Sequence, residues 1–561
     1  MPVLPFPEYK PDISDFNGAS TTTLLNVLPR ADGYGPVNDV SAFTGALPSE
    51  CRGVFMARKD DGSIVLYAGT TTELYVLDNT SLTWTKVSKG GGPYSTLATT
   101  ANWSFAQFGS KLIAVQANTV PQVVDVESGG AFADLGGSPP QAAQVAIINR
   151  FVVLSGLLSY PRRVQWSGLN AITTWTSGTT YSDYQDMPDG GNVACVVGGE
   201  FGVIVQDGAI RRMIFSPGSD IVFQIDRIAR GIGCNLPSSV VEANGVVFMY
   251  TPKGFISVTP DGGLNPIGLE RVDRYFAANA YFANPHLIQG AADPASNLIL
   301  WTYREVERGS GTSFNRALVF NATLNRWAPI ELEGEYLCQI GKPGITLENL
   351  GTIGSVTISN AADNGSGLVR LTVTSTSGWA TGDIKDIHDV TGTTEANGTW
   401  TITVVDGTTI DLQGSTFANA YVSGGYVAGS LDDMTVSLDD FSAATLAQMA
   451  LVNADHELGY FTGSAKEATL TSAEQSGVAR RIFVRGLYPI TDATSAYASV
   501  GARESLQASA SYSSETAVNT QGFCPQRVST RHARGKVRIP AGTSWTFATG
   551  VEPDFTYEGR R

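Results

Sequence analysis

The stretch INRFVVLS at residues 148–155 decides the fold, because a short turn at Asn149-Arg150 is followed by an apolar run with the length of a buried β-strand. The same arrangement occurs six times between residues 52 and 331, as DDGSIVLY (60–67), FGSKLIAV (108–115), INRFVVLS (148–155), GGEFGVIV (198–205), ANGVVFMY (243–250) and ASNLILWT (295–302). The second strands of these units begin near Ile64, Leu112, Phe151, Phe201, Val246 and Leu298. Their average spacing of about 47 residues is that of a propeller blade. The sequence therefore predicts an all-β protein with an approximately six-bladed β-propeller.

Two of the units end alike, in VLDNTSLTW (76–84) and VFNATLNRW (319–327). We interpret the Asp or Asn and the Thr as turn formers, and the final Trp as a side chain that fills the space between blades. Burial of such a ring contributes roughly 2–3 kcal/mol. The residues predicted to pack between blades are Trp84, Trp175 and Trp327.

The composition changes on both sides of the repeat and indicates four regions. Residues 1–51 are rich in Pro, Gly and Thr and are expected to form an arm or platform strands, and residues 52–343 form the propeller. Residues 344–430 read as an inserted small β domain, with strands such as GTWTITVVD separated by Gly and Asn turns. Residues 431–561 form a C-terminal platform domain, in which ATLAQMALVNA (444–454) is expected to be a helix.

The net charge of −15 argues against a protein whose main task is to grip nucleic-acid phosphates, because such surfaces need clustered Lys and Arg. Simple solubility explains the charge, and so does the wall of a conduit that DNA passes without sticking. The C-terminal residues are the exception, because cations gather there in an otherwise acidic chain. They form either a solvated strand face, a subunit-docking face for an acidic partner, or a weak contact with passing DNA, and are Arg527, Arg531, Arg534, Lys536, Arg538, Arg560 and Arg561.

Signals of enzymatic chemistry are weak throughout the chain. The four histidines, His286, His388, His456 and His532, fall in no metal-binding motif, and the five cysteines form no CxxC pair. There is no phosphate-binding loop and no nucleophile elbow. We therefore expect no catalytic residue, no metal, no cofactor, no signal peptide and no membrane span.

Four stretches carry a family resemblance. They are NVLPRADGYGP (26–36), the blade series, RRVQWSGLNAITTW (162–175), and RVSTRHARGKVRIPAGTSWTFATG (527–550) closing on EGRR. In these the chain resembles the tail nozzle or hub proteins of short-tailed bacteriophages, the group that includes tail tubular protein B and the packaged-DNA stabilisation proteins. The matches are short motifs distributed over most of the chain.

The resemblance implies a homo-oligomeric ring, a hexamer in that family, below the portal and adaptor complex. Such a ring would retain packaged double-stranded DNA, conduct it during ejection, and adjoin tail fibres or spikes. The propeller would surround a platform built from residues 1–51 and 431–561. The location implied is the virion tail, after synthesis in the cytoplasm of the bacterial host.

Two rival functions remain open. A receptor- or glycan-binding propeller needs exposed aromatic side chains on one rim, and the best candidates are Trp175, Tyr181 and Tyr184. Those aromatics equally suit the packing of loops. A polysaccharide-degrading propeller enzyme is the other rival, since propellers host glycosidases that use paired carboxylates.

Overall fold

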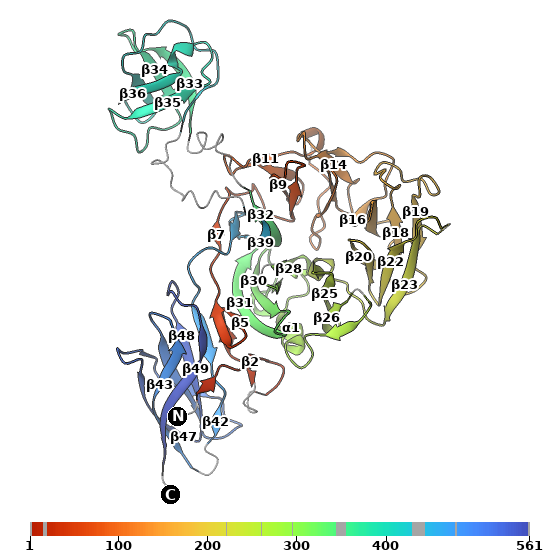
Figure 1. Cartoon of the computed structure of the whole chain (residues 1–561), viewed down its shortest axis with the longest axis vertical. Coiled ribbons are helices and arrows are strands. Elements are labelled where there is room, and N and C mark those ends of the chain that lie inside the picture. Colours follow the sequence, from red (N-terminus) through yellow and green to blue (C-terminus); the bar gives the residue numbers. More distant parts are fainter. Residues whose placement is uncertain are drawn as a thin grey trace. The chain divides into compact units, whose positions relative to one another are not determined.

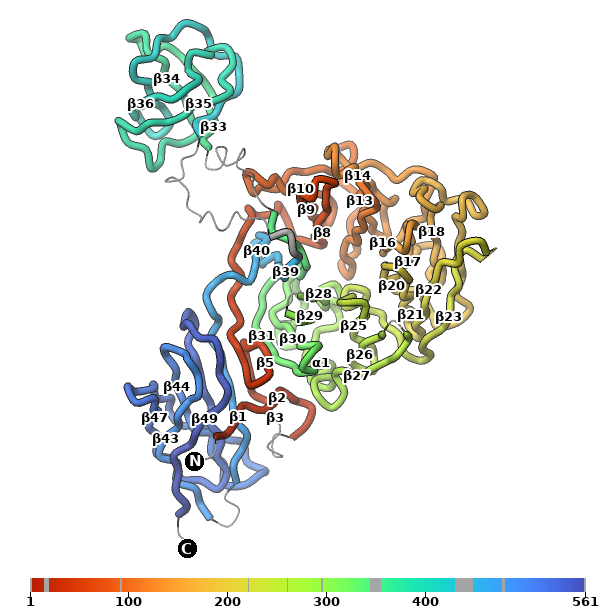
Figure 2. The backbone as a smooth tube through the Cα atoms, viewed as in Figure 1, coloured from red at the N-terminus to blue at the C-terminus, as the bar shows by residue number. Residues whose placement is uncertain are grey.

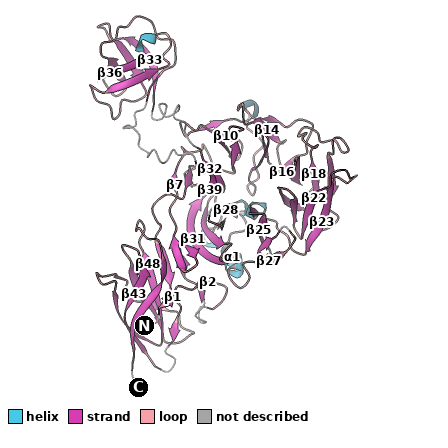
Figure 3. Cartoon of the chain, in the orientation of Figure 1, coloured by secondary structure: helices cyan, strands magenta, loops and turns pink. Residues whose placement is uncertain are grey.

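The computed structural model describes residues 3–14, 20–91, 93–219, 221–259, 261–293, 296–343, 355–428, 444–476 and 480–558. Strands dominate these residues (Figure 3). The single α-helix among them is the short α1 (Asp273–Asn279). The predicted helix at 444–454 is wrong, since residues 444–452 form the strand β39 (Ala444–Val452). Pairing with neighbouring strands there overrides the helical preference of its Ala, Leu, Gln and Met residues.

Six four-stranded antiparallel sheets follow one another along the chain (Figure 1). The first blade contains β8 (Val54–Arg58), β9 (Ile64–Gly69), β10 (Leu74–Leu77) and β11 (Trp84–Lys86). The second contains β12 (Ser104–Phe108), β13 (Lys111–Val115), β14 (Gln122–Asp125) and β15 (Ala133–Asp134). The third contains β16 (Ala142–Ile148), β17 (Phe151–Leu157), β18 (Arg163–Trp166) and β19 (Asp183–Asp186).

The next three blades repeat this meander. The fourth contains β20 (Val193–Val197), β21 (Gly202–Gln206), β22 (Ala209–Phe215) and β23 (Phe223–Arg230). The fifth contains β24 (Val241–Ala243), β25 (Val246–Thr251), β26 (Gly254–Val258) and β27 (Leu264–Pro266). The sixth contains β28 (Gly290–Asp293), β29 (Leu298–Tyr303), β30 (Phe314–Asn321) and β31 (Arg326–Gly334).

The hairpin turns explain why the repeat can be detected in the sequence. Asn149, Asn244 and Asn297 all adopt positive φ, between 52° and 54°, as the tight turns between first and second strands require. Each second strand begins within one residue of its predicted start. The predicted β-propeller is confirmed.

A seventh sheet closes the ring, so the described residues form seven blades and not six. This seventh blade has the strand order β32-β39-β40-β7, from β32 (Tyr336–Lys342), β39, β40 (Leu458–Tyr460) and β7 (Ser41–Ala42). Ala450 and Val452 of β39 pack with the first blade, while Met449 and Leu451 pack with the sixth. This alternation places the sheet between the two blades at the ends of the repeat.

Side chains next to the axis also hold the seventh blade to its neighbours. Gln289, which precedes the sixth blade, accepts the Leu337 N–H at 2.7 Å and donates to the Glu335 carbonyl at 2.9 Å. The buried Glu335 carboxylate accepts the Cys51 N–H at 2.8 Å and lies 2.9 Å from His456 Nδ1. Burial raises the pKa of Glu335.

Strands from both ends of the chain build one further domain, whereas β7, β39 and β40 from the same two predicted platform regions belong to the seventh blade. In one sheet the order is β47-β43-β49-β6-β5, from β47 (Cys524–Thr530), β43 (Ile482–Thr491), β49 (Ala548–Tyr557), β6 (Gly33–Pro36) and β5 (Val27–Arg30), with β1 (Leu4–Pro5) also on β49. In the other the order is β4-β41-β48-β44-β45, from β4 (Leu24–Leu25), β41 (Ala468–Thr471), β48 (His532–Ile539), β44 (Tyr497–Arg503) and β45 (Ser511–Tyr512). Figure 2 shows the N-terminal strands among the C-terminal ones. We call this two-sheet domain the sandwich.

Asn26 ties the sandwich to the sixth blade. Its N–H donates to the Pro329 carbonyl, its Oδ1 accepts the Glu331 N–H, and its Nδ2 donates to the Glu467 carbonyl. The residue is buried and has a φ of 56°, a conformation that Asn tolerates better than most residues.

The inserted β domain is a closed barrel with its own hydrophobic core. Its strand order is β33-β34-β37-β36-β35-β38, from β33 (Val356–Asp363), β34 (Val369–Val373), β37 (Thr409–Leu412), β36 (Gly398–Val404), β35 (Ile384–His388) and β38 (Tyr426–Val427). Val369, Ile387, Ile402 and Val427 are fully buried in it. The insert thus forms a compact unit distinct from the rest of the chain.

Candidate functional site

The three tryptophans predicted to pack between blades differ in their environments. Trp327 is 1 % exposed, stacks on Trp301 at 5.6 Å, and donates its indole N–H to the Ile267 carbonyl of the fifth blade. Trp175 is buried with residues of the second and third blades. Trp84 is only half-buried, beside the core that the first and seventh blades share.

Two tryptophans that the sequence analysis did not select also bridge neighbouring blades. Trp103, just before the second blade, donates to the Thr70 carbonyl of the first at 2.7 Å. Trp301 of the sixth blade donates to the Ser239 carbonyl, just before the fifth, at 2.9 Å. Each indole therefore adds a directional bond to the apolar contact between blades.

The predicted subunit-docking cations that the structure describes lie on the sandwich, and two of those on β48, Lys536 and Arg538, already have acidic partners. Arg538 Nε lies 2.7 Å from Glu515 Oε2, and its NH1 lies 3.0 Å from Glu467 Oε2. Lys536 Nζ lies 4.0 Å from Glu515 Oε1. Arg538 also stacks over the Tyr497 ring at 4.6 Å. These cations alternate with buried residues along β48, so the strand has one solvated face and one core face.

The other predicted cations are placed differently. Arg527 on β47 and Arg531 after it are exposed, and Arg531 Nε is 4.0 Å from Glu504 Oε2. Arg534 is half-buried on β48. Arg560 and Arg561 lie outside the described residues. Of the predicted cations that the structure describes, Arg527 and Arg531 are thus the two exposed to a partner.

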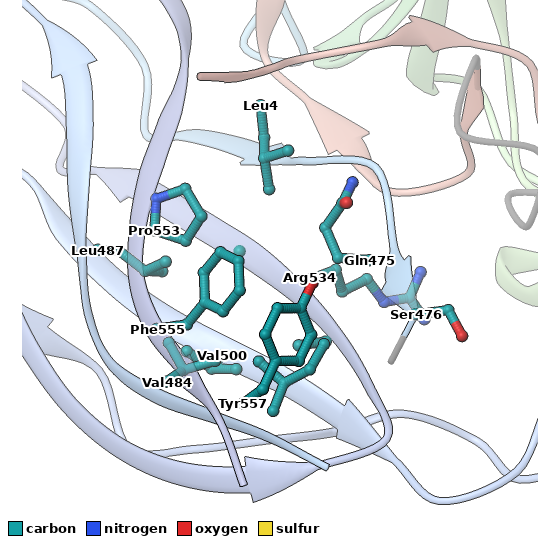
Figure 4. A pocket seen from close by; sticks show the side chains of 13 residues that line it. Leu4, Gln475, Ser476, Val484, Leu487, Val500, Arg534, Pro553, Phe555 and Tyr557 are labelled. Atoms are coloured by element: carbon teal, nitrogen blue, oxygen red, sulfur yellow. The ribbon is translucent and has the colours of Figure 1, made fainter. Parts of the chain in front are cut away.

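Arg534 borders an apolar pocket of about 60 Å³ between the two sheets of the sandwich (Figure 4). Val484, Leu487, Val500 and Phe555 line it. Ligand pockets usually measure about 300–1,000 Å³. This pocket is therefore too small for a typical ligand.

At the propeller axis, a buried arginine organises a polar network that the sequence analysis missed. Arg52 is 4 % exposed and donates to the carbonyls of Ala98, Thr99 and Ala101. It also donates to Glu50 Oε1 at 3.0 Å and to Asn102 Oδ1 at 3.3 Å. One guanidinium thus joins the start of the first blade to the loop that leads into the second.

His286 lies beside this network. It is 3 % exposed, and its Nε2 is 3.9 Å from Glu50 Oε1. Burial and the charge of Arg52 lower the pKa of His286 to about 3. The imidazole is therefore neutral at physiological pH.

A neutral polar cavity of about 230 Å³ lies where the first strands of the blades approach the axis. Asn102, Ser104, Gln144, Ser238 and Gln289 supply polar groups to it, and no Asp, Glu, Lys, Arg or His lines it among the residues described. The cavity has room for several water molecules. Its lining by the first strands of several blades matches the position at which a propeller has its axial channel.

The outer strands of the third blade, and the turn before β18, carry a cluster of side chains on the surface, which we call the aromatic patch: Tyr160, Arg163, Tyr184 and Asp186. The Arg163 guanidinium carbon lies 4.1 Å from the Tyr160 ring centre and 3.6 Å from the Tyr184 ring centre. Arg163 also binds Asp186 through two parallel hydrogen bonds of 2.7 and 2.9 Å. These bonds hold the pKa of the Asp186 carboxyl below its usual value.

Only part of this region was predictable from the sequence. Of its three rim candidates, Tyr181 and Tyr184 are exposed, whereas Trp175 is buried and donates to the Ile172 carbonyl. Tyr160 and Arg163 were missed. The pairing of β18 with β19 sets Arg163 opposite Asp186. The register of this pair is hard to predict from the sequence, because a connection of sixteen residues separates the two strands.

Comparisons with known proteins give fold likeness alone. No family model matches the sequence, and no curated protein matches it. Among solved structures, the Neurospora crassa Pan2 WD40 domain is 8 % identical, with a TM-score of 0.35 over 55 % of this chain and 90 % of that one. BamB from Moraxella catarrhalis is 12 % identical, with a TM-score of 0.30 over 62 % of this chain and 90 % of that one. The extracellular domain of a proposed hybrid two-component system from B. thetaiotaomicron is 12 % identical, with a TM-score of 0.34, and the match spans 62 % of this chain but only 45 % of that one.

Among the described residues, no helix has the length and hydropathy to cross a membrane. No three His, Cys, Asp or Glu side chains of these residues are grouped so as to hold a metal ion.

Proposed function

We propose that this protein is a structural subunit of the tail of a short-tailed bacteriophage, of the nozzle or hub type. The observation that supports this most is the sandwich, in which strands from residues 4–36 and 468–557 interleave. The family resemblance implies such a platform, built from sequence outside the blades. A domain that ties both chain ends together suits a subunit that must bear mechanical load.

In this proposal the subunit joins, seals and conducts, without a catalytic step or a cofactor. It forms a homo-oligomeric ring, a hexamer by the resemblance, below the adaptor and portal, in a virion tail assembled in the host cytoplasm. The net charge of −15 repels DNA phosphates and lets the genome pass without adhering. The barrel of residues 356–427 is the part we assign to contact with fibres or spikes.

Native mass spectrometry with negative-stain imaging tests this proposal, on the purified chain alone and mixed with extract containing empty phage heads. We expect a closed ring with an axial hole, or a ring that joins the head vertex. A persistent monomer that never joins heads would contradict the proposal.

A second candidate, a receptor-binding propeller, is favoured by the exposed aromatic patch on the third blade. Replacement of Tyr184 should then abolish host adsorption while particles still assemble. A polysaccharide-degrading enzyme is the remaining alternative, and release of reducing sugar by the purified protein would establish it.

A further inference from the structure

Exposed aromatic side chains concentrate on one blade of the propeller. Among its described residues, four aromatic side chains are at least 40 % exposed: Tyr160, Tyr181, Tyr184 and Phe282. Three of these four belong to the third blade. Exposed aromatic rings gathered in one place mark an interaction surface, whereas isolated ones need no explanation.

The aromatic patch is held rigid before any partner arrives. Tyr160 is 52 % exposed and Tyr184 is 41 % exposed, although the guanidinium of Arg163 packs against both rings. The Arg163 side chain itself is only 15 % exposed, and its two bonds to Asp186 fix its plane. Pre-organised rings lose little conformational freedom on binding, which favours affinity.

The charge of the patch indicates a neutral partner. Arg163 and Asp186 neutralise each other in a paired geometry. The adjacent Arg162 and Asp183 carry opposite charges as well. Such a surface offers no net attraction to an anionic polymer such as nucleic acid, nor to a polycation.

The edge of the blade argues against an added peptide strand. The outermost strand, β19, has only four residues and carries an aspartate at each end, Asp183 and Asp186. Short strands bearing charges are the usual protection of a sheet edge from strand addition. A partner is therefore expected to contact the rings and not the backbone of the edge.

We propose that the aromatic patch binds a neutral polysaccharide. The C–H face of a pyranose stacks on the outward surface of Tyr160 or Tyr184, and ring hydroxyls bond to Asp186 and to the tyrosine hydroxyls. Asp186 is suited to this, because its side chain is 57 % exposed and its oxygens keep free lone pairs while bound to Arg163. The inference deepens the binding-propeller candidate, and it holds whether or not the chain forms a nozzle ring.

Affinity electrophoresis of the full chain in native gels tests the proposal, with dextran, galactomannan or amylose cast into the gel. We expect at least one of these neutral polysaccharides to retard migration. Y160A and Y184A should each weaken binding about tenfold, the effect of losing roughly 1.4 kcal/mol of stacking. Y184F should retain most of the binding, because it keeps the ring.

The matched control is Y512A in the sandwich, where Tyr512 is 39 % exposed and also lies under a cation, Lys536, at 5.5 Å. Its binding should equal that of the wild type. The proposal is overturned if none of the three polysaccharides retards the protein, if gelatin or hyaluronan retards it while they do not, or if Y512A weakens binding as much as Y184A. Native mass spectrometry of the same variants separates this result from the nozzle proposal, since all of them should keep the wild-type oligomeric state.

Discussion

Replacement of Arg52 by Met is expected to destabilise the propeller more than any surface change. The side chain makes six hydrogen bonds, to Glu50, Asn102 and three main-chain carbonyls. Removal of one member of a buried ion pair costs about 3–5 kcal/mol. Ala98 and Thr99 are exposed, so water can satisfy their carbonyls in the variant. We therefore expect a loss near the lower end, about 3 kcal/mol.

Urea unfolding followed by tryptophan fluorescence measures this loss in the transition of the propeller. The control is R274M, because Arg274 is 70 % exposed and its one ion pair among the described residues is with Glu270, four residues earlier. Exposed pairs of this kind contribute about 0.2–1 kcal/mol. A loss for R52M of less than about 1 kcal/mol, or equal to that of R274M, would refute the role assigned to Arg52.

The R52M variant gives a second, independent measurement, the pKa of His286. Burial and the charge of Arg52 lower the pKa of His286 to about 3, so its ring should not titrate between pH 5 and 8 in the wild type. In R52M the repelling cation is gone and Glu50 remains 3.9 Å away, so the pKa of His286 must rise. Carbon-13 NMR of labelled histidine resolves this among only four histidines. An unchanged pKa would mean that burial alone controls the ring.

Three further predictions concern other parts of the chain. Burial and the nearby Asp12 raise the pKa of Asp273 to about 6. The folded state therefore holds this proton more tightly than the unfolded state, and the free energy of unfolding falls as pH rises from about 4 to 6. D273N, which can still accept the Phe255 N–H, should be more stable than wild type at pH 8, and this advantage in urea unfolding should disappear below pH 4. W327A should lower the free energy of unfolding, measured in urea, by about 3–5 kcal/mol, and W84A by less than half of that, because of these two tryptophans only Trp327 is fully buried. Equal losses in the two variants would contradict the blade-packing role. Residues 355–428 expressed alone should fold and unfold cooperatively by circular dichroism, because the barrel has its own core, and a disordered spectrum would show that it depends on the rest of the chain.

The sequence predicted the six blades whose paired strands and turns lie close together along the chain. Each turn and the two strands beside it lie within about twenty residues, so Asn244-Gly245 between two apolar runs is enough to place a hairpin. The seventh blade lacks this property. Its strands come from residues 41–42, 336–342, 444–452 and 458–460, and the insert of about a hundred residues separates two that pair. No repeat detected by spacing can include such a sheet.

The residues of the candidate site also differ in whether local sequence is enough to predict them. Tyr184 and Tyr181 were found because exposed aromatics in a polar loop are visible in the sequence itself. Arg52 looked like an ordinary charged residue, since nothing nearby in sequence shows that it will be 4 % exposed among carbonyls some 46 to 49 residues away. Long-range partners of this kind follow from tertiary packing and not from motif or composition.

The charges of the sandwich constrain how any partner can dock there. Arg538 and Lys536 already share Glu515, and Arg538 also holds Glu467, so a partner's acidic group would have to displace bonds that exist. Exchange of one exposed ion pair for another gains little free energy. Arg527 and Arg531 are more exposed, and charges at such positions mainly govern the rate of association and its salt dependence. Lys536 and Arg538 therefore serve the sheet that carries them, and we expect these two cations to add little to the affinity for any docked partner.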